Sequence, residues 1–361
     1  MKTAIRLLAA LTLPACIQAA TTLRISTTQL RPESNIEIIF DRAVVTENQL
    51  NQPIANTILK IKPELAGKIA WRSTNIARFV PDEAPKMGTN YTFSLAKGVK
   101  TREGVELPAK TLRTIVAENF KVMGSSRRSA STSYTRQPVY YVYFNDEIDP
   151  DKTANQFIFK NKDGVIVPAK IRRATWADIK SRYYLRSTWQ QRFQAVKDGK
   201  KTILSEEPTT PITNALMVTS ASPLPVGDKW YLHVLKNTPN ASLTAKDFTG
   251  RNIYIGDIDP FELRSITPSV AANQPRELHV SFKSYLPENP NNEALASFAK
   301  VIPPVKNVQY KTLGKTLIIS GDFRERDDWN VVLNQGITSR SGLVLEKTAP
   351  KLIKFKTVPS A

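Results

Sequence analysis

A motif that occurs three times in the same register is the feature that most constrains the fold of this 361-residue chain. The copies are Tyr91, Phe93, Leu95, Gly98, Gly104, Leu107; the weaker Trp230, Leu232, Val234, Asn237; and Trp329, Val331, Leu333, Gly336, Gly342, Leu345. Each has apolar residues at alternate positions and stops at a residue that tolerates positive φ, as a half-buried strand that enters a turn requires. Three copies predict three similar β domains.

A second alternating strand precedes each copy and ends at Phe40, Phe144 or Phe282. From that Phe to the aromatic residue that leads the motif, the interval is 51, 86 and 47 residues in turn, so the middle unit carries an insertion of roughly 35 to 40 residues. Units of about 95 residues with several short strands fit an immunoglobulin-like β-sandwich. The predicted fold is therefore all-β, with three tandem immunoglobulin-like β-sandwich domains and a helical insertion, at about 175–198, in the middle one.

The insertion itself has a helical pattern. Aromatic and aliphatic residues recur at intervals of three, four or six from Trp176 to Val196 and predict one helix of about six turns. Arg186 is the position that breaks this apolar stripe. Asp198 and Gly199, followed by two lysines, indicate a helix stop with cations near the negative end of the helix dipole.

Changes in composition indicate the domain boundaries. Residues 124–133 are small and polar without periodicity, which indicates a mobile connection between the first two domains. Pro268 and Pro275 mark a shorter and stiffer joint before the third domain. The predicted organisation is a signal peptide at 1–20, domain 1 at 21–119, a linker at 120–133, domain 2 with the basic helical insertion at 134–264, and domain 3 at 265–361.

The first twenty residues have the layout of a secretory signal peptide. Lys2 and Arg6 precede the apolar stretch 7–13, and small residues follow at Ala15 and Ala19. We therefore expect an exported protein that is cleaved after Ala19. No later apolar run approaches the roughly 18 residues of a membrane span.

The same segment permits a second interpretation, a lipoprotein. Leu13, Pro14, Ala15 and Cys16 resemble a bacterial lipobox, in which the cysteine after the cleavage site is acylated, although Pro14 departs from the usual pattern. Cys16 is therefore a candidate lipidation site. It is also the only cysteine, so a mature chain without it has no disulfide, thiolate nucleophile, Cys-based zinc site or internal thioester.

The net charge of +19, or +17 after removal of residues 1–20, is high for a chain of this length. Such a charge favours contact with anionic lipid head groups, cell-wall polymers or nucleic acid, and salt weakens that contact. It equally suits a basic exported protein that is kept in solution by its charge. Charge alone therefore leaves the partner open.

The charge is concentrated between Lys170 and Lys201, where ten Lys or Arg residues are accompanied by only Asp178 and Asp198 and are interleaved with five aromatic residues. Basic residues beside stacking rings are suited to single-stranded nucleic acid or an anionic glycan. The alternative is an amphipathic helix with packed aromatic residues and solvated cations. The candidate residues for an anionic ligand are Arg172, Arg173, Lys180, Arg182, Arg186 and Arg192.

No residue pattern predicts a catalytic or metal site. His233 and His279 are the only histidines, and each alternates with apolar residues in a strand. The motifs of serine hydrolases, phosphate loops and zinc proteases do not occur. The acidic run from Asn145 to Asp151 is interpreted as turn capping, with calcium binding as the alternative. We expect no catalytic residue, no metal, no cofactor and no enzyme activity.

The first unit also shows a family pattern. A strand that ends in Phe is followed in order by Ile61–Pro63, Trp71, Arg78–Pro81 and Gly88–Gly98. This order resembles the immunoglobulin-like domains at the front of bacterial alpha-2-macroglobulin-like proteins, and similar modules are found in bacterial surface-layer and adhesion proteins. The resemblance spans nearly the whole mature chain.

The resemblance implies a non-catalytic, exported structural and interaction protein of the periplasm or cell envelope, lipid-anchored in many members and here through Cys16. It implies the amino-terminal arm of an alpha-2-macroglobulin-like endopeptidase inhibitor, with proteases or other envelope proteins as partners through a longer chain. On this resemblance the sequence is either the front of such a longer protein or a shortened relative of the family. The alternative is an envelope module that binds an anionic polymer (lipopolysaccharide, cell-wall glycan or nucleic acid) through the basic helix of domain 2.

Overall fold

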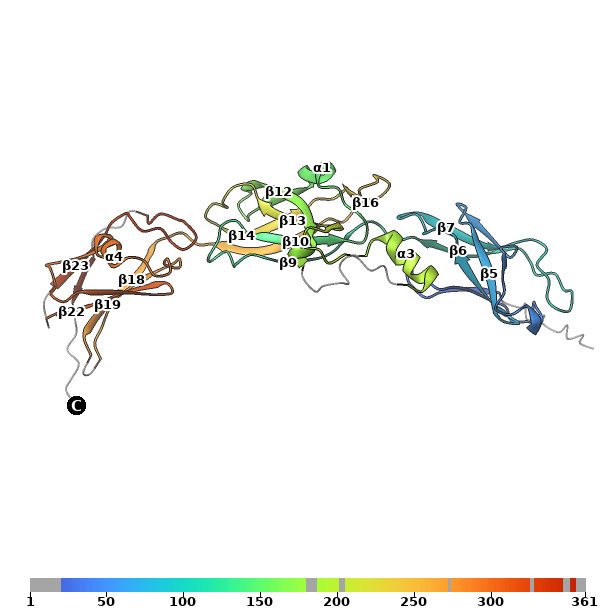
Figure 1. Cartoon of the computed structure of the whole chain (residues 1–361), viewed down its shortest axis with the longest axis horizontal. Helices are drawn as coiled ribbons and strands as arrows, with labels where there is room; N and C mark the ends of the chain where they lie inside the picture. Colours follow the sequence, from blue (N-terminus) through green and yellow to red (C-terminus); the bar gives the residue numbers. More distant parts are fainter. Residues whose placement is uncertain are drawn as a thin grey trace, which may run out of the picture. The chain divides into compact units, whose positions relative to one another are not determined.

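The computed structural model describes residues 21–179, 187–200, 205–271, 274–324, 328–346 and 351–354. In this part of the chain strands dominate (Figure 1), and the ladders that join them into sheets are antiparallel. The predicted all-β class is therefore confirmed. Contacts group the chain into two compact units, one from Met1–Glu118 with Trp189–Thr202 and the other from Asn119–Thr188 with Ile203–Ala361.

In the first unit two antiparallel sheets enclose one core. Successive side chains of a strand point to opposite faces of the sheet. Ile36 and Ile38 therefore face the core and are 1% and 0% exposed, whereas the alternating residues Glu37 and Ile39 are less buried. The sheet orders are β1-β2-β6-β5-β3 and β4-β7-β8. The elements are β1 (Thr22–Ile25), β2 (Ile36–Ile39), the 3-10 turn η1 (Glu47–Gln49), β3 (Pro53–Ala55), β4 (Leu59–Lys62), β5 (Gly67–Ser73), β6 (Ile76–Pro81), β7 (Asn90–Leu95) and β8 (Thr111–Val116).

The middle sandwich is the first part of the second unit, and its long strand β12 (Ile166–Thr175) connects the two halves of a seven-stranded sheet. β12 pairs with β11 through Ile166–Pro168 and with β13 through 169–175. Such a change of partner along one strand is typical of a strand that passes from one layer of a sandwich to the other. The sheet order is β17-β14-β11-β12-β13-β10-β9. The other elements are β9 (Val122–Arg127), β10 (Val139–Phe144), α1 (Pro150–Thr153), η2 (Ala154–Gln156), β11 (Phe157–Lys160), β13 (Pro211–Ser220), β14 (Gly227–Val234), the pair β15 (Thr238–Pro239) and β16 (Lys246–Asp247), and β17 (Arg251–Ile258).

The third sandwich follows in the same unit and repeats the two-sheet plan of the first. Its sheets have the orders β18-β19-β22-β21 and β20-β23-β24, and one core holds them together. Phe261, Phe282 and Phe298 form a cluster of rings in that core, with centroids 5.1 to 6.3 Å apart. The elements are β18 (Leu263–Ser269), β19 (Arg276–Phe282), α4 (Asn292–Phe298), β20 (Ala299–Ile302), β21 (Gln309–Leu313), β22 (Thr316–Gly321), β23 (Asp328–Leu333) and β24 (Lys351–Lys354).

The threefold sequence motif corresponds to one strand in each sandwich, namely β7, β14 and β23. The leading aromatic residues Tyr91, Trp230 and Trp329 are 2%, 0% and 3% exposed. The three strands therefore anchor three cores, as the alternation predicts.

The segment 120–133, predicted as a linker, contains a strand. β9 forms the edge of the seven-stranded sheet and pairs with β10. Gly124 within it is required by packing, because a Cβ at this position would lie 2.6 Å from the ring of Tyr143. β9 thus occupies Val122–Arg127 of the segment predicted as a linker, and the domain boundaries, this linker included, stay predictions.

The helical insertion is present, but in the part of it that the structure describes it is not one continuous helix. α2 (Trp176–Ile179) follows β12 directly, and α3 (Trp189–Asp198) begins after the non-helical residues Ser187 and Thr188. The spacing from Thr188 to Gln191 is that of a capping box, a helix start that the continuous apolar stripe conceals. α3 belongs to the first unit, although its sequence lies between β12 and β13 of the middle sandwich.

Candidate functional site

The basic residues predicted to bind an anionic ligand lie on separate elements. Arg172 and Arg173 lie on β12 in the second unit, and Arg192 lies on α3 in the first. Lys180, Arg182, Arg186 and the lipidation candidate Cys16 fall outside the described residues. The described candidates are therefore not carried together by one helix, and their binding role stays a prediction.

Arg172 closes the turn between β12 and α2. Its guanidinium donates two hydrogen bonds to the carboxylate of Asp178, at 2.8 and 2.7 Å, and Asp178 also accepts from the backbone N and the hydroxyl of Thr175. The hydrogen bond from Arg172 lowers the pKa of Asp178 to about 2. Arg173 donates to the carbonyl of Thr213 at 3.0 Å. Both arginines thus have structural partners within their own unit, Arg172 on α2 and Arg173 on β13.

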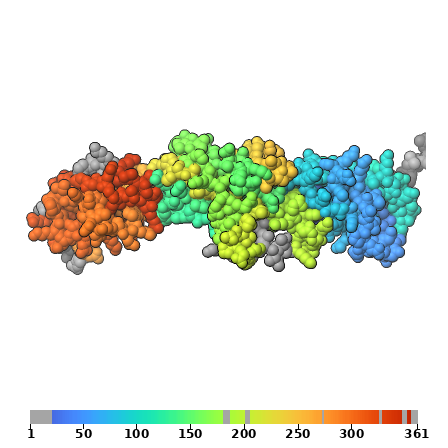
Figure 2. Space-filling model, turned by 45° about the horizontal axis from the view of Figure 1, so that its top comes forward, coloured from blue at the N-terminus to red at the C-terminus, as the bar shows by residue number. Residues whose placement is uncertain are grey.

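The aromatic residues of α3 pack into the first unit. Trp189 and Phe193 are 2% and 7% exposed and contact the buried Ala84 and the partly buried Met87. The indole Nε1 of Trp189 donates to the carbonyl of Pro85 at 2.8 Å. Figure 2 shows α3, in yellow-green, against the blue-to-cyan surface of the first unit. In α3, therefore, the aromatic residues of the basic segment serve packing rather than ligand stacking.

Two cationic side chains of α3 also bind residues of the first unit, at the edge of the area where Trp189 and Phe193 pack. Arg192 pairs with Glu33 and lies over the ring of Trp189, 5.6 Å from its centroid. Lys197 donates to the carbonyl of Asp82 at 3.1 Å. Arg192 is therefore already paired within the first unit, as the amphipathic-helix alternative implies.

The acidic run after β10 caps turns. Asp149 accepts from the backbone N of Asp151 at the start of α1, and Asn145 joins the backbone of Lys121 to that of Asn119. Among the described residues no cluster of three or more His, Cys, Asp or Glu side chains is arranged to hold a metal ion. The hydrogen bonds of Asp149 and Asn145 are those that the capping interpretation expects.

Each of the two histidines lies beside a polar side chain. The Nδ1 atom of His233 lies 2.7 Å from the amide oxygen of Asn252, and the Nε2 atom of His279 lies 2.8 Å from the carboxylate of Glu277. Neither contact resembles a nucleophile activated by a base.

Within the described ranges, no helix has both the length and the apolar character needed to span a bilayer.

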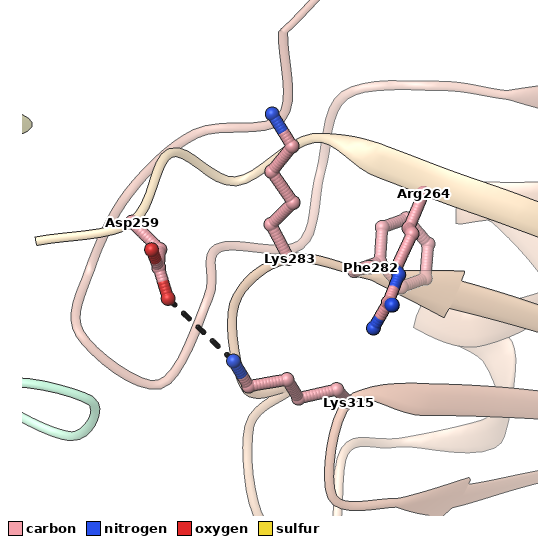
Figure 3. Close-up of a pocket in the computed structure, with 5 residues that line it drawn as sticks. All are labelled: Asp259, Arg264, Phe282, Lys283 and Lys315. Atoms are coloured by element: carbon pink, nitrogen blue, oxygen red, sulfur yellow. Dashed lines mark ion pairs between the residues drawn. The ribbon is translucent and has the colours of Figure 1, made fainter.

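A second cationic place lies on the third sandwich, and it was missed from the sequence. A pocket of about 230 Å³ is lined by Asp259, Arg264, Phe282, Lys283 and Lys315. The Lys315 ammonium lies 3.6 Å from Asp259, and Figure 3 shows these two side chains facing each other while the amine of Lys283 points away. Lys283 pairs with Glu262 at 2.5 Å, which raises its pKa above the usual value.

The pocket was missed because its cations are far apart in the sequence. Arg264, Lys283 and Lys315 come from β18, the residue after β19 and the turn before β22. These three cations do not belong to one run of charged residues in the sequence. The ten Lys and Arg residues between 170 and 201, by contrast, follow one another closely and are seen in the sequence alone. Only the pairing of β18, β19 and β22 could have indicated the site.

Comparisons with known proteins give fold-level likeness only. Neither the protein-family models nor the curated proteins give a match. A crystal structure of native alpha-2-macroglobulin from Escherichia coli, spanning domains MG0, NIE and MG1, covers 93% of this chain and 97% of that one at 10% identity and a TM-score of 0.24. A crystal structure of the S-layer protein SbsC covers 91% and 54% at 9% identity and a TM-score of 0.19. These scores are too low to carry an argument, so the all-β assignment rests on the sheets themselves.

Proposed function

We propose that this chain is an exported, non-catalytic structural and interaction protein, and that it serves as the amino-terminal arm of an alpha-2-macroglobulin-like endopeptidase inhibitor. The observation that carries the proposal is the packing of α3, a helix from the middle of the chain, into the first unit. The polypeptide therefore passes between the two units three times. A segment that leaves the middle sandwich, packs within the first unit and returns is suited to a structural role.

Contacts inside the second unit support the same role. The guanidinium of Arg340 lies 4.1 Å from the ring centroid of Tyr134 and pairs with Glu288 at 2.6 Å. The rings of Tyr134 and Tyr285 are 4.8 Å apart, and Arg136 donates to the carbonyl of Ser341 at 3.1 Å. The segment between β9 and β10 thus contacts the turns of the third sandwich through aromatic and charged side chains.

The family assignment within this proposal comes from the sequence pattern. Trp71, Phe79 and Tyr91, which belong to that pattern, are buried core residues of the first unit. Because these residues are buried, the pattern that carries the resemblance reflects the packing of the core and not a reactive site. The proposed endopeptidase inhibition therefore belongs to a larger assembly, and this chain supplies its scaffold.

The intact mass of the protein purified from its native envelope tests the proposal. We expect a mass well above 40.4 kDa, with the mass of acyl chains if Cys16 is lipidated. The isolated 361-residue chain should leave the cleavage of a large protein substrate by an endopeptidase unchanged. Protease trapping by the isolated chain, or a native mass equal to residues 20–361 alone, would contradict the proposed arm.

A second candidate function, binding of an anionic envelope polymer through the basic segment, is favoured by the net charge of +19. It predicts that changing Arg182, Arg186 and Arg192 to Gln lowers the salt concentration needed to elute the protein from heparin. The control changes three exposed arginines of the first sandwich, Arg42, Arg72 and Arg102, and leaves the same net charge. Equal elution of the two triple variants would refute a role specific to the segment.

A further inference from the structure

We infer that Arg264 and Lys315 on the third sandwich form a binding site for a single carboxylate or phosphate group of a larger anionic molecule. Both side chains line the pocket shown in Figure 3. This site is independent of the proposed scaffold role and of the 170–201 segment.

The strand register identifies the equivalent positions. The backbone N of Phe282 donates to the carbonyl of Lys315 at 2.9 Å, just as the backbone N of Phe40 donates to the carbonyl of Asn75 at 2.9 Å. Lys315 therefore takes the hairpin position that a neutral asparagine takes in the first sandwich. The fold does not require a cation there.

Arg264 has its position because of a β-bulge. Leu263 pairs with Phe282 and Ser265 with Ser281, so Arg264 is the extra residue. The middle sandwich has the same bulge between Val122 and Gly124, where Met123 is the extra residue. A bulge redirects its side chain, and only in the third sandwich is that side chain cationic.

The strands of the first sandwich show what the bulge adds. β1 and β2 pair without a register shift from Thr22 opposite Ile39 to Ile25 opposite Ile36. The residue after the Phe also differs between the sandwiches, since it is Asp41 in the first and Lys283 in the third. The cationic character therefore belongs to the third sandwich rather than to the shared architecture.

The charges in the pocket are only partly compensated. Arg264 is exposed and has no ion pair or hydrogen bond with any residue in the described part of the chain. The pair of Lys315 with Asp259 is 3.6 Å long and partly exposed, and such pairs contribute little. Lys315 also lies 5.1 Å from the ring centroid of Tyr285, which favours its present direction. One free guanidinium and one weakly paired ammonium thus share the pocket.

These groups select the class of ligand. A guanidinium presents a planar fork of donors that matches a carboxylate or a phosphate, and an ammonium adds a compact positive charge. A volume of about 230 Å³ is below the usual range of roughly 300–1,000 Å³ for small-molecule sites, so it suits one anionic group rather than a whole ligand. Binding of such a group should be weak and should decrease with added salt.

Titration of the full chain with inorganic phosphate and, separately, with glucuronate tests the site. In nitrogen-15 spectra that resolve the arginine Nε–Hε signals, we expect a saturable shift of the Arg264 signal over the millimolar range. The apparent dissociation constant from the backbone signals of β18 and β22 should rise about tenfold in Arg264→Gln, since a hydrogen bond to a charged group is lost. Lys315→Gln should cause a smaller rise.

Two further variants make the test decisive. Lys311→Gln removes an exposed lysine of the same sheet and should leave the titration unchanged. Asp259→Asn removes the competing carboxylate and should strengthen binding. A response to phosphate alone or to glucuronate alone identifies the source of the anionic group. Shifts that do not saturate with either probe, or equal shifts in Arg264→Gln and Lys311→Gln, would overturn the proposal.

Discussion

A similar turn follows the motif strand in each of the three sandwiches. The middle turn has a different residue at the left-handed position from the first and third turns, but nearly the same backbone conformation. Gly104 and Gly342 have φ values of +82° and +81°, and Leu243 takes the corresponding position with φ +62°. The N–H of each donates to a carbonyl three residues earlier, at 2.8 to 3.0 Å. Because leucine maintains the left-handed conformation, the turn does not depend on glycine alone.

A buried polar side chain anchors each turn, and here the copies differ most. In the first turn the hydroxyl of Thr101 accepts from the backbone N of Val105 at 3.3 Å. In the middle turn the amide oxygen of Asn240 accepts from Thr244 and Ala245, at 2.9 and 3.1 Å, and its amide nitrogen donates to Asp146. The copy with leucine in place of glycine thus has the more extensive anchor, and we expect these hydrogen bonds to offset the strain of the left-handed leucine.

The largest effect should come from the aromatic residue that leads each copy. Trp230 is fully buried, so Trp230→Ala should lower the unfolding free energy of the middle sandwich by about 3–5 kcal/mol through the cavity that it leaves. Hydrogen exchange of the β14 and β17 amides measures this loss. Trp329→Ala should act equally on β23 and the third sandwich. A loss below about 1 kcal/mol in either one would show that the copies are not equivalent.

The sequence predicts these strands because alternation is a local signal. Tyr91, Phe93 and Leu95 belong to one face whatever lies across the sheet, and all three are buried. The positions of the motif glycines likewise follow from a local backbone requirement, the positive φ. Most of the fold class was therefore accessible without the structure.

The features that were missed depend on residues distant in sequence. Gly124 is small because Tyr143 lies over it, so composition alone makes β9 resemble a linker. The apolar stripe of the insertion does not reveal that Trp189 packs beside Pro85 in the first unit rather than in its own domain. Arg264 and Lys315 meet only through strand pairing. Each of these depends on tertiary contacts that a sequence window does not contain.

The next largest effect should come from the polar anchors. Asn240→Ala leaves two backbone N–H groups without their acceptor at a site that is 2% exposed, and should cost about 2–3 kcal/mol. Thr101→Ala removes one long hydrogen bond in the first turn and should cost about 1 kcal/mol. Amide exchange in the two turns measures both losses. Equal losses would break the proposed compensation between anchor and strain.

A smaller effect is expected from the glycines. A Cβ at Gly104 or Gly342 would meet no atom within 4 Å, so alanine adds no clash and only the cost of a left-handed backbone. Gly104→Ala and Gly342→Ala should each cost about 1 kcal/mol. The measurement is amide exchange within each turn, with Gly164→Ala, also at positive φ and unobstructed, as a control at a turn outside the motif. No change in any of the three would mean that φ strain does not limit these turns.

The smallest and most diagnostic effect has the opposite sign. Leu243 is 58% exposed, so Leu243→Gly gives up little apolar burial and relieves the left-handed strain. Glycine also raises the entropy of the unfolded chain, which offsets part of this relief. The free energy of opening of the middle turn should therefore increase by about 0.5 kcal/mol, which slows amide exchange about twofold. Leu243→Ala removes the same side chain without relieving φ and should not slow exchange. If both variants slow exchange equally, the exposed side chain rather than the backbone is the source of the strain, and the anchor of Asn240 compensates for something other than φ.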